Sequence, residues 1–297
     1  MSQMPAAEVE LDEARVRRLL ADQHPDLAGL PITMIGSGWD NAIFRLGDEL
    51  CVRLPRRALA APLIAFEQQW LPVLAPRLPV PVPVPIRVGV PSPEYPWAWS
   101  VCPWLDGHPA AGVAMPRPPR VAAALGTFVA SLHRDAPPDA PENPYRGVPL
   151  GDRDGPTRER IEQLGSLIDG RAVGLAWATA LATPPWEQPA RWIHGDLHPA
   201  NILLDDTDLD LVGVLDFGDL TSGDPATDLA VAWMLFDPDS RTRFRSFAGD
   251  AAADEDTWAR ARGWAVSLAL AYLAHAADHP VMADVGLRTL DRVLAEP

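Results

Sequence analysis

The chain has 297 residues, of which 47% are hydrophobic and 22% are charged. These proportions are typical of a folded globular protein, and the length allows two packed units of about 150 residues each. The formal net charge of −15 argues against a nucleic-acid or anionic-membrane partner, because both partners require a basic protein face. The same charge suits solubility and is compatible with a cationic small substrate.

Arginine supplies all of the positive charge outside histidine, since the chain contains no lysine. The segment over residues 1–10 lacks the basic and apolar regions of a secretory signal. The longest apolar stretch, residues 264–277, is interrupted by polar side chains. It is too short to span a bilayer and predicts a buried helix. Cys51 and Cys102 lie in apolar, strand-like segments and are expected to be reduced thiols. We therefore expect a cytoplasmic protein without a membrane partner.

The first hundred residues predict a small sheet with two helices. The pair Gly47-Asp48 is a hairpin signal, and Gly36–Asn41 predicts a turn between two further strands. Four alternating prolines between residues 79 and 85 predict an extended segment. In chain order, the expected elements are a helix over Leu11–Ala21, strands over Ile32–Ile35, Ala42–Leu46 and Leu50–Leu54, a helix over Ala58–Leu74, and strands over Ile86–Val90 and Trp97–Cys102.

The remainder of the chain predicts a helical unit. Residues 103–119 are rich in Gly and Pro and predict the boundary between the two units. We therefore expect an α+β protein with one domain over residues 1–102 and a second over residues 103–297. A hairpin is expected over Asn201–Leu204 and Val212–Phe217. Helices are expected over Val121–Arg134, Thr157–Ile168, Ala172–Ala182, Pro225–Phe236, Thr257–Ala277 and Val281–Leu294.

Two short motifs carry the chemistry. Residues 194–201 have the form H-x-D-x-x-x-x-N, and residues 216–218 read D-F-G. In kinase chemistry the first Asp receives the proton of the attacking hydroxyl, while the Asn and the second Asp hold Mg²⁺ against the nucleotide phosphates. Asp196 taken alone could be a turn residue that caps the loop before Pro199. Because Asn201 and Asp216 both fall into register, the catalytic interpretation is favoured.

On these motifs the chain resembles the aminoglycoside phosphotransferase family, a group of kinase-like small-molecule phosphotransferases. The resemblance implies a two-lobe, protein-kinase-like fold, with a small antiparallel β-sheet lobe and a larger, mainly helical lobe. It implies Asp196 as the catalytic residue, Asn201 and Asp216 as Mg²⁺ ligands, and ATP or GTP as the phosphate donor. His194 and Asp228 are expected to brace the catalytic loop. No A-P-E motif follows D-F-G, which argues against a protein kinase and favours a small-molecule hydroxyl acceptor.

The resemblance also implies a nucleotide site in the first unit. Gly36, Ser37 and Gly38 stand where a kinase glycine-rich loop covers the phosphates, and Gly permits a close backbone approach. Asn41 replaces the third glycine of that loop, and a plain hairpin turn would have the same pattern. The backbone around Cys102 is expected to form the hinge that binds the purine.

Arg53 stands where the family places its phosphate-binding strand lysine. A guanidinium can bind phosphates through two parallel hydrogen bonds, so the replacement is chemically reasonable. Glu67, in the following helix, is its expected ion-pair partner, with a surface Glu as the alternative interpretation. Arg56 and Arg57 are expected to face solvent.

The acceptor pocket is expected among the C-terminal helices. Acidic side chains there could bind the ammonium groups of an aminoglycoside, and aromatic side chains could line an apolar pocket for a macrolide-like acceptor. Surface charge and ordinary helix core are the alternatives. The acidic candidates are Asp237, Asp239, Asp254, Glu255 and Asp256, and the aromatic candidates are Trp233, Phe236, Trp258 and Trp264.

The first functional hypothesis is transfer of a nucleoside triphosphate γ-phosphate to an aminoglycoside or another hydroxyl-bearing antibiotic. A metabolic amino alcohol or sugar is the second acceptor class. A pseudokinase, which binds a ligand without turnover, is the alternative from a different class. The absence of lysine favours the pseudokinase, and the intact set of Asp196, Asn201 and Asp216 opposes it.

Overall fold

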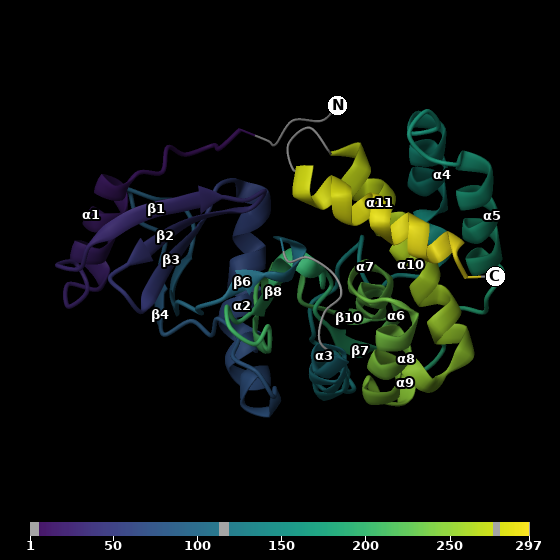
Figure 1. The fold of residues 1–297 in the computed structure, drawn as a ribbon. Coiled ribbons are helices and arrows are strands. Elements are labelled where there is room, and N and C mark those ends of the chain that lie inside the picture. The colour runs from purple at the N-terminus through teal and green to yellow at the C-terminus, as the bar shows by residue number, and fades with distance from the viewer. Residues whose placement is uncertain (1–5, 113–118, 276–279, 297) are drawn as a thin grey trace.

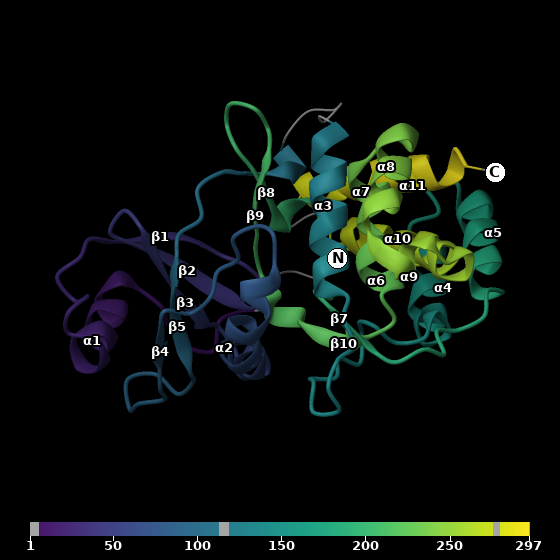
Figure 2. The same ribbon diagram turned by 90° about the horizontal axis from the view of Figure 1, so that it is seen from below.

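The computed structural model describes residues 6–112, 119–275 and 280–296. These residues form two lobes that lie side by side, a sheet lobe in purple and blue and a helical lobe in green and yellow (Figures 1 and 2). Each lobe has its own cluster of buried apolar side chains. The two-lobe α+β architecture expected from the motifs is therefore confirmed.

The N-terminal lobe contains a five-stranded sheet of order β1-β2-β3-β5-β4 in which every neighbouring pair is antiparallel. Side chains alternate along β3, so Val52 and Leu54 enter the apolar cluster that α1 completes. Cys51 and Arg53 point to the opposite face, toward the helical lobe. The elements are α1 (Glu13–Gln23), β1 (Ile32–Ser37), β2 (Asn41–Leu46), β3 (Leu50–Pro55), α2 (Ala61–Leu74), β4 (Arg87–Gly89) and β5 (Trp99–Pro103).

The helical lobe is organised around α10, against which α4, α5, α6, α7, α9 and α11 all pack. Asp254 caps the start of α10 by accepting the N–H of Thr257. None of the described helices is both long and apolar enough to cross a membrane. The helices are α3 (Pro119–Leu132), α4 (Asp154–Gln163), α5 (Gly170–Leu181), α6 (Ala226–Leu229), α7 (Val231–Leu235), α8 (Pro238–Phe247), α9 (Gly249–Ala253), α10 (Glu255–Ala274) and α11 (Pro280–Leu294).

Two small sheets hold the motif segments in the helical lobe. β7 (Arg191–Ile193) pairs with β10 (Thr221–Gly223), and β8 (Ile202–Leu204) lies between β6 (His108–Pro109) and β9 (Leu211–Val214). The H-x-D-x-x-x-x-N segment runs from the end of β7 to the start of β8, and the D-F-G segment runs from β9 to β10. The two motifs therefore lie next to each other. Short 3₁₀ turns occur at Ala58–Ala60, Ala75–Arg77, Ala110–Gly112, Leu150–Arg153 (η4), Pro199–Asn201 and Phe217–Asp219.

Some predicted elements were wrong or missing. The helix expected over Pro225–Phe236 is two short helices, α6 and α7. Nearly every residue there is buried, so apolar periodicity could not reveal the break. α8 was not predicted because its sequence is mostly polar, although Asp237 caps it. The strands β7 and β10 contain three residues each, too few for a recognisable alternation.

Two expectations extend beyond the described residues. The helix predicted over Thr257–Ala277 corresponds to α10, and its last positions, 276 and 277, lie outside the described residues. The same holds for residues 113–118 of the expected linker.

Candidate active site

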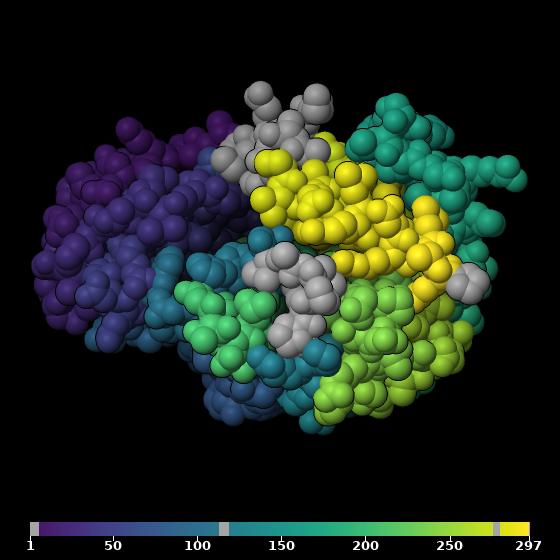
Figure 3. Space-filling view, in the orientation of Figure 1, coloured from purple at the N-terminus to yellow at the C-terminus, as the bar shows by residue number. Residues whose placement is uncertain are grey.

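A cleft of about 1080 Å³ lies between the two lobes. The strands β2 and β3 line one side of it through Ile43, Cys51 and Arg53. The motif loops and α10 line the other side, including Asp196 and Tyr272. In the space-filling view the lobes form distinct masses, purple and blue against green and yellow (Figure 3).

A buried network holds the loop that carries Asp196. The Asp228 carboxylate accepts the backbone N–H groups of His194 at 2.7 Å and of Gly195 at 2.9 Å. His133 lies 3.1 Å from the same carboxylate. Gly195 adopts φ +82°, and a Cβ added there would lie 2.2 Å from the carbonyl oxygen of Asp219. The loop therefore requires a glycine at this position, and Asp228 braces it as expected.

His194 connects the catalytic loop to the segment before D-F-G. Its Nδ1 accepts the backbone N–H of Asp196 at 3.2 Å. Because Nδ1 is an acceptor, Nε2 carries the proton and donates to the carbonyl of Leu215 at 2.8 Å. The imidazole also packs against the ring of Phe217, with centroids 4.5 Å apart. These contacts agree with the structural role expected for His194.

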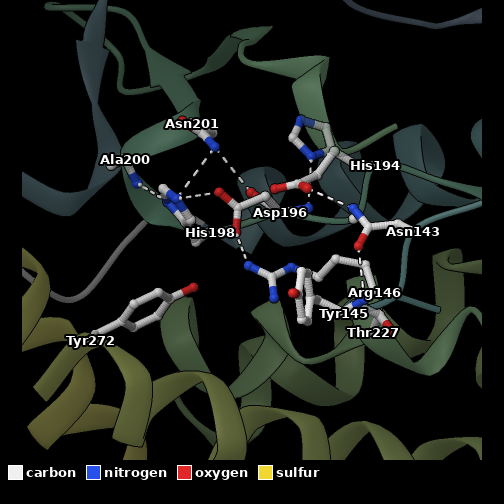
Figure 4. Close-up of polar contacts among 12 residues, drawn as sticks. Asn143, Tyr145, Arg146, His194, Asp196, His198, Ala200, Asn201, Thr227 and Tyr272 are labelled. Atoms are coloured by element: carbon white, nitrogen blue, oxygen red, sulfur yellow. Dashed lines mark hydrogen bonds and ion pairs between the residues drawn. The ribbon is translucent and has the colours of Figure 1, made fainter. Parts of the chain in front are cut away.

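Arg146 and His198 both contact the Asp196 carboxylate (Figure 4). Oδ1 accepts a hydrogen bond from Arg146 Nη2 at 3.2 Å, and Oδ2 lies 3.2 Å from His198 Nε2. Burial would raise the pKa of Asp196, but His198, Arg146 and His194 together bring it well below its usual value. Asp196 is therefore ionised at neutral pH and acts as a strong hydrogen-bond acceptor.

Sequence reasoning missed Arg146 and gave His198 no role. Arg146 belongs to the Pro-rich loop before α4, fifty residues upstream of Asp196, and no sequence signal indicates that the two meet. Tyr272 of α10 approaches the same carboxylate from the opposite side (Figure 4). Its burial, together with the nearby charge of Asp196, raises the Tyr272 pKa well above its usual value. Asp219, another residue not singled out, accepts a hydrogen bond from Asn143 at 2.7 Å beside this group.

The two predicted metal ligands both line the cleft. Asn201 uses its amide nitrogen to donate to the carbonyl of Asp196 at 3.0 Å, which leaves its amide oxygen as an acceptor. Asp216 adopts a left-handed backbone conformation with φ 59°, and its side chain is 53% exposed. Among the described residues, no group of three or more His, Cys, Asp or Glu side chains could enclose a metal ion. One carboxylate and one amide oxygen suit Mg²⁺, which keeps waters and shares its coordination with phosphates.

Arg53 forms the ion pair that was expected with Glu67. Its Nη1 lies 2.6 Å from Glu67 Oε2, and its Nη2 lies 3.1 Å from Asp216 Oδ1. Arg53 and Glu67 are both buried. Burial alone would lower the pKa of Arg53, but the Glu67 and Asp216 carboxylates raise it above its usual value. A fixed positive charge therefore lies next to the predicted metal ligand Asp216.

The expectation that Arg56 and Arg57 face solvent was wrong. Arg56 is buried and donates to the carbonyl of Gly38 at 2.8 Å. Arg57 lies 2.9 Å from the carboxylate of Asp40 and is largely covered. The turn between β1 and β2 folds back over the end of β3, and the two arginines hold this turn by its backbone and by Asp40.

The glycine-rich segment lies at the end of β1. Gly38 lines the cleft, whereas Gly36 and Ser37 are not among the lining residues. A Cβ at Gly36 would meet nothing within 4 Å, and one at Gly38 only the carbonyl oxygen of Asn41 at 3.8 Å. The packing of the protein therefore does not require glycine at either position. Cys102 is buried in β5 opposite Cys51, and the Cys51 side chain is the one that lines the cleft.

The acceptor end of the cleft differs from the expectation. Asp237 and Asp254 are helix caps, and none of the five acidic candidates lines the cleft. Of the four aromatic candidates, only Trp264 lines it. Arginines line this region instead, at positions 146, 153 and 160.

The chain was compared with known families and structures. The family model described as "Phosphotransferase enzyme family" matches residues 31–264, a span that contains Arg53 and both motifs. No curated protein sequence matches the chain.

Several solved structures share the fold. A GDP and kanamycin complex of APH(2")-IIia superimposes with a TM-score of 0.72 at 20% identity, covering 95% of this chain and 99% of that one. The apoenzyme of macrolide 2'-phosphotransferase MphH from Brachybacterium faecium gives a TM-score of 0.60 at 22% identity, covering 96% and 98%. A streptomycin–ATP–APH(2")-IIa ternary complex gives 0.59 at 16% identity, covering 95% and 97%. These likenesses support the kinase-like fold, and the family match spans most of the chain. The chain belongs to the phosphotransferase enzyme family.

Proposed function

We propose that this protein transfers the γ-phosphate of a nucleoside triphosphate to a hydroxyl group of a small molecule. The observation that carries the proposal is the convergence of Asp196, Asn201, Asp216 and Arg53 on one cleft. Phosphoryl transfer requires an oriented nucleophile and neutralised phosphate charge, and these four residues are the types that provide both. We further propose that residues 1–102 bind the nucleotide and that residues 103–297 carry the catalytic loop and the acceptor pocket.

The nucleotide is ATP or GTP in this proposal. Arg53 would bind the phosphates in place of the usual lysine, with Glu67 fixing the orientation of its guanidinium. The turn at Gly36, Ser37 and Gly38 would cover the phosphates, since the open space at both glycines leaves room for a ligand. The backbone next to Cys102 would hold the base. Among the similar structures, one is a complex with GDP and another is a complex with ATP.

Asn201 and Asp216 are the proposed Mg²⁺ ligands. Both residues have an oxygen available toward the cleft, which is the donor type that Mg²⁺ prefers. When bound, Mg²⁺ would neutralise phosphate charge. Arg53 contributes a second positive charge next to this site, with its Nη2 3.1 Å from Asp216 Oδ1.

Asp196 is proposed to accept a hydrogen bond from the acceptor hydroxyl and to orient its oxygen for attack. Its lowered pKa makes it a weak proton acceptor in the ground state. Orientation of the nucleophile is therefore its main contribution. The bond from the γ-phosphorus to the β,γ-bridging oxygen breaks, the nucleoside diphosphate leaves, and the proton moves to Asp196 Oδ late in the reaction as the new O–P bond forms. The hydroxyl would lie in the space bounded by Asp196, Arg146 and Tyr272 (Figure 4).

The acceptor class follows from the family and from the similar structures. These include complexes with kanamycin, streptomycin and gentamicin, and macrolide phosphotransferases. Hydroxyl-bearing antibiotics are therefore the first acceptors to test, and metabolic amino alcohols and sugars are the second. We place the reaction in the cytoplasm, because both cysteines are free thiols.

An acceptor screen tests the proposal. Consumption of ATP and GTP is measured with Mg²⁺ and a panel of hydroxyl compounds, and mass spectrometry checks for a phosphorylated product. Acceptor-dependent consumption with a product 80 Da heavier (the mass of HPO₃) supports the proposal. Nucleotide binding without hydrolysis or transfer under any condition would instead identify a pseudokinase.

A further inference from the structure

Three arginines line one part of the cleft wall. Arg146 comes from the loop before η4, Arg153 ends η4, and Arg160 lies in α4. Arg153 and Arg160 are seven positions apart on a nearly continuous helical segment, so they lie on the same face two turns apart. Arg146 lies next to Asp196. The wall therefore extends positive charge away from the predicted catalytic residue into the acceptor end of the cleft.

Two of these charges are not neutralised by the protein. Arg146 pairs with Asp196, but among the described residues no carboxylate lies within ion-pair distance of Arg153 or Arg160. The Nε atom of Arg153 is buried without a hydrogen-bond partner among the described residues, and its guanidinium lies 5.6 Å from the centroid of the Tyr145 ring. Burial and the neighbouring arginines lower the pKa of both side chains. Both side chains are partly exposed, so an anion bound in the cleft could pair with charges to which the protein offers no carboxylate partner.

The charges around Arg153 and Arg160 support the same conclusion. The acidic neighbours in sequence, Asp152 and Glu159, are exposed, and the chain as a whole carries a net charge of −15. Four carboxylates also line the cleft, and three of them pair with other arginines: Asp40 with Arg57, Asp196 with Arg146 and Asp216 with Arg53. Among the described residues, the unpaired positive charge of the cleft is therefore that of Arg153 and Arg160. A guanidinium binds a carboxylate or phosphate through paired hydrogen bonds and repels an ammonium group.

We infer that the acceptor carries an anionic group, a carboxylate or a phosphate, which Arg153 and Arg160 bind while a hydroxyl of the same molecule reaches Asp196. The inference rests on the proposed phosphotransferase function and names the chemical class of its acceptor. An anionic acceptor differs in charge from the polycationic aminoglycosides of the first hypothesis.

Isothermal titration calorimetry with matched polyhydroxyl compounds tests the inference. The probes are gluconate and glucose 6-phosphate as anions, glucose as the neutral compound, and glucosamine as the cation. Mg²⁺ and a saturating non-hydrolysable ATP analogue (AMP-PNP) are present throughout, so the α-, β- and γ-phosphate positions are filled and the anions cannot report on the nucleotide phosphate site. We expect the anions to bind at least about tenfold more tightly than glucose and glucosamine, the effect of one charge-assisted contact.

Variants assign the preference to these two residues. The double variant Arg153→Gln/Arg160→Gln should lose the preference for anions. The matched control is Arg158→Gln, since Arg158 lies on the same helix, is exposed and pairs with Asp154, and it should keep the preference. Circular dichroism checks that each variant is folded. Equal binding of all four probes by the wild type, or an anion preference that survives in the double variant, overturns the inference.

The anionic acceptor and the phosphotransferase function can be contradicted separately. A protein that hydrolyses Mg–ATP but shows no preference for anions contradicts the anionic acceptor and leaves the phosphotransferase proposal standing. A protein that binds the anions through Arg153 and Arg160 but never turns over a nucleotide contradicts the phosphotransferase proposal and leaves the anion site standing.

Discussion

Arg146 Nη2 lies 3.2 Å from Asp196 Oδ1, so an arginine from a distant loop holds the predicted catalytic carboxylate in its ionised form. The contact has two consequences. It fixes the orientation of the carboxylate, and it helps to keep the Asp196 pKa low. Both consequences depend on residues that are far apart in sequence.

Arg146→Gln should move the pH dependence of turnover. Arg146 lowers the Asp196 pKa, and the active form of Asp196 is ionised, so activity is present above that pKa and is lost as the pH falls through it. Removing the guanidinium raises the pKa, and the acidic limb of the kcat/KM profile should shift to higher pH. Because the wild-type limb lies below the ordinary pKa of Asp, the profile is measured on both proteins from about pH 8 down to the lowest pH at which circular dichroism shows that both are folded. An unchanged acidic limb would show that Arg146 does not control the ionisation of Asp196.

Gly195→Ala should destabilise the protein. The backbone there has φ +82°, and the new Cβ would lie 2.2 Å from the carbonyl oxygen of Asp219. We expect a loss of about 1–3 kcal/mol in the free energy of unfolding, measured by urea denaturation. Gly174→Ala is the matched control, because a Cβ at that position in α5 meets nothing within 4 Å. The control should be neutral or more stable by about 0.5–1 kcal/mol, and equal stability of the two variants would contradict the prediction.

Asp216→Ala should abolish the Mg²⁺ dependence of nucleotide binding. Asp216 supplies the only carboxylate of the proposed metal site, and without the metal the triphosphate charge would face Asp196 and Asp219. Calorimetric titration of the nucleotide with and without Mg²⁺ measures the effect. Wild-type dependence on Mg²⁺ in the variant would place the metal on other residues.

Arg53→Ala should reduce kcat/KM. The expected loss of transition-state stabilisation is about 1.5–3 kcal/mol, the scale of one charged hydrogen-bonding partner. Arg53→Lys should keep part of the activity, since lysine supplies the charge without the paired geometry. Arg56→Ala should weaken nucleotide binding, because Arg56 holds the Gly38 carbonyl. Arg15→Ala, in α1 and outside the residues that line the cleft, is the control. If Arg53→Ala has no effect while the wild type turns over, Arg53 does not replace the missing lysine.

The sequence predicted the two-lobe fold and the proximity of the motifs, because hairpin signals and the spacing from Asp196 to Asn201 are local features. The family resemblance implied the Arg53–Glu67 pair, which the structure contains. Arg146 could not be predicted, since long-range packing alone brings its loop to the catalytic segment.

Packing also explains the remaining errors. Arg56 was expected to face solvent, but the turn between β1 and β2 folds back over the end of β3 and covers it. Alternation along a strand cannot predict such a contact. Two of the acidic candidates, Asp237 and Asp254, are helix caps, and a cap cannot be distinguished from a ligand-binding carboxylate by composition alone. The arginines of the acceptor wall carried no motif, so only the cleft itself reveals them.

The central claim is that Asp196 acts in phosphoryl transfer, and Asp196→Asn tests it most directly. Single-turnover transfer or hydrolysis of Mg–ATP and the dissociation constant of the nucleotide are measured on wild type and variant. The account predicts that turnover falls by about 10²- to 10⁴-fold while nucleotide affinity stays nearly unchanged. Near-normal turnover in the variant would contradict the assignment of Asp196 and the mechanism built on it.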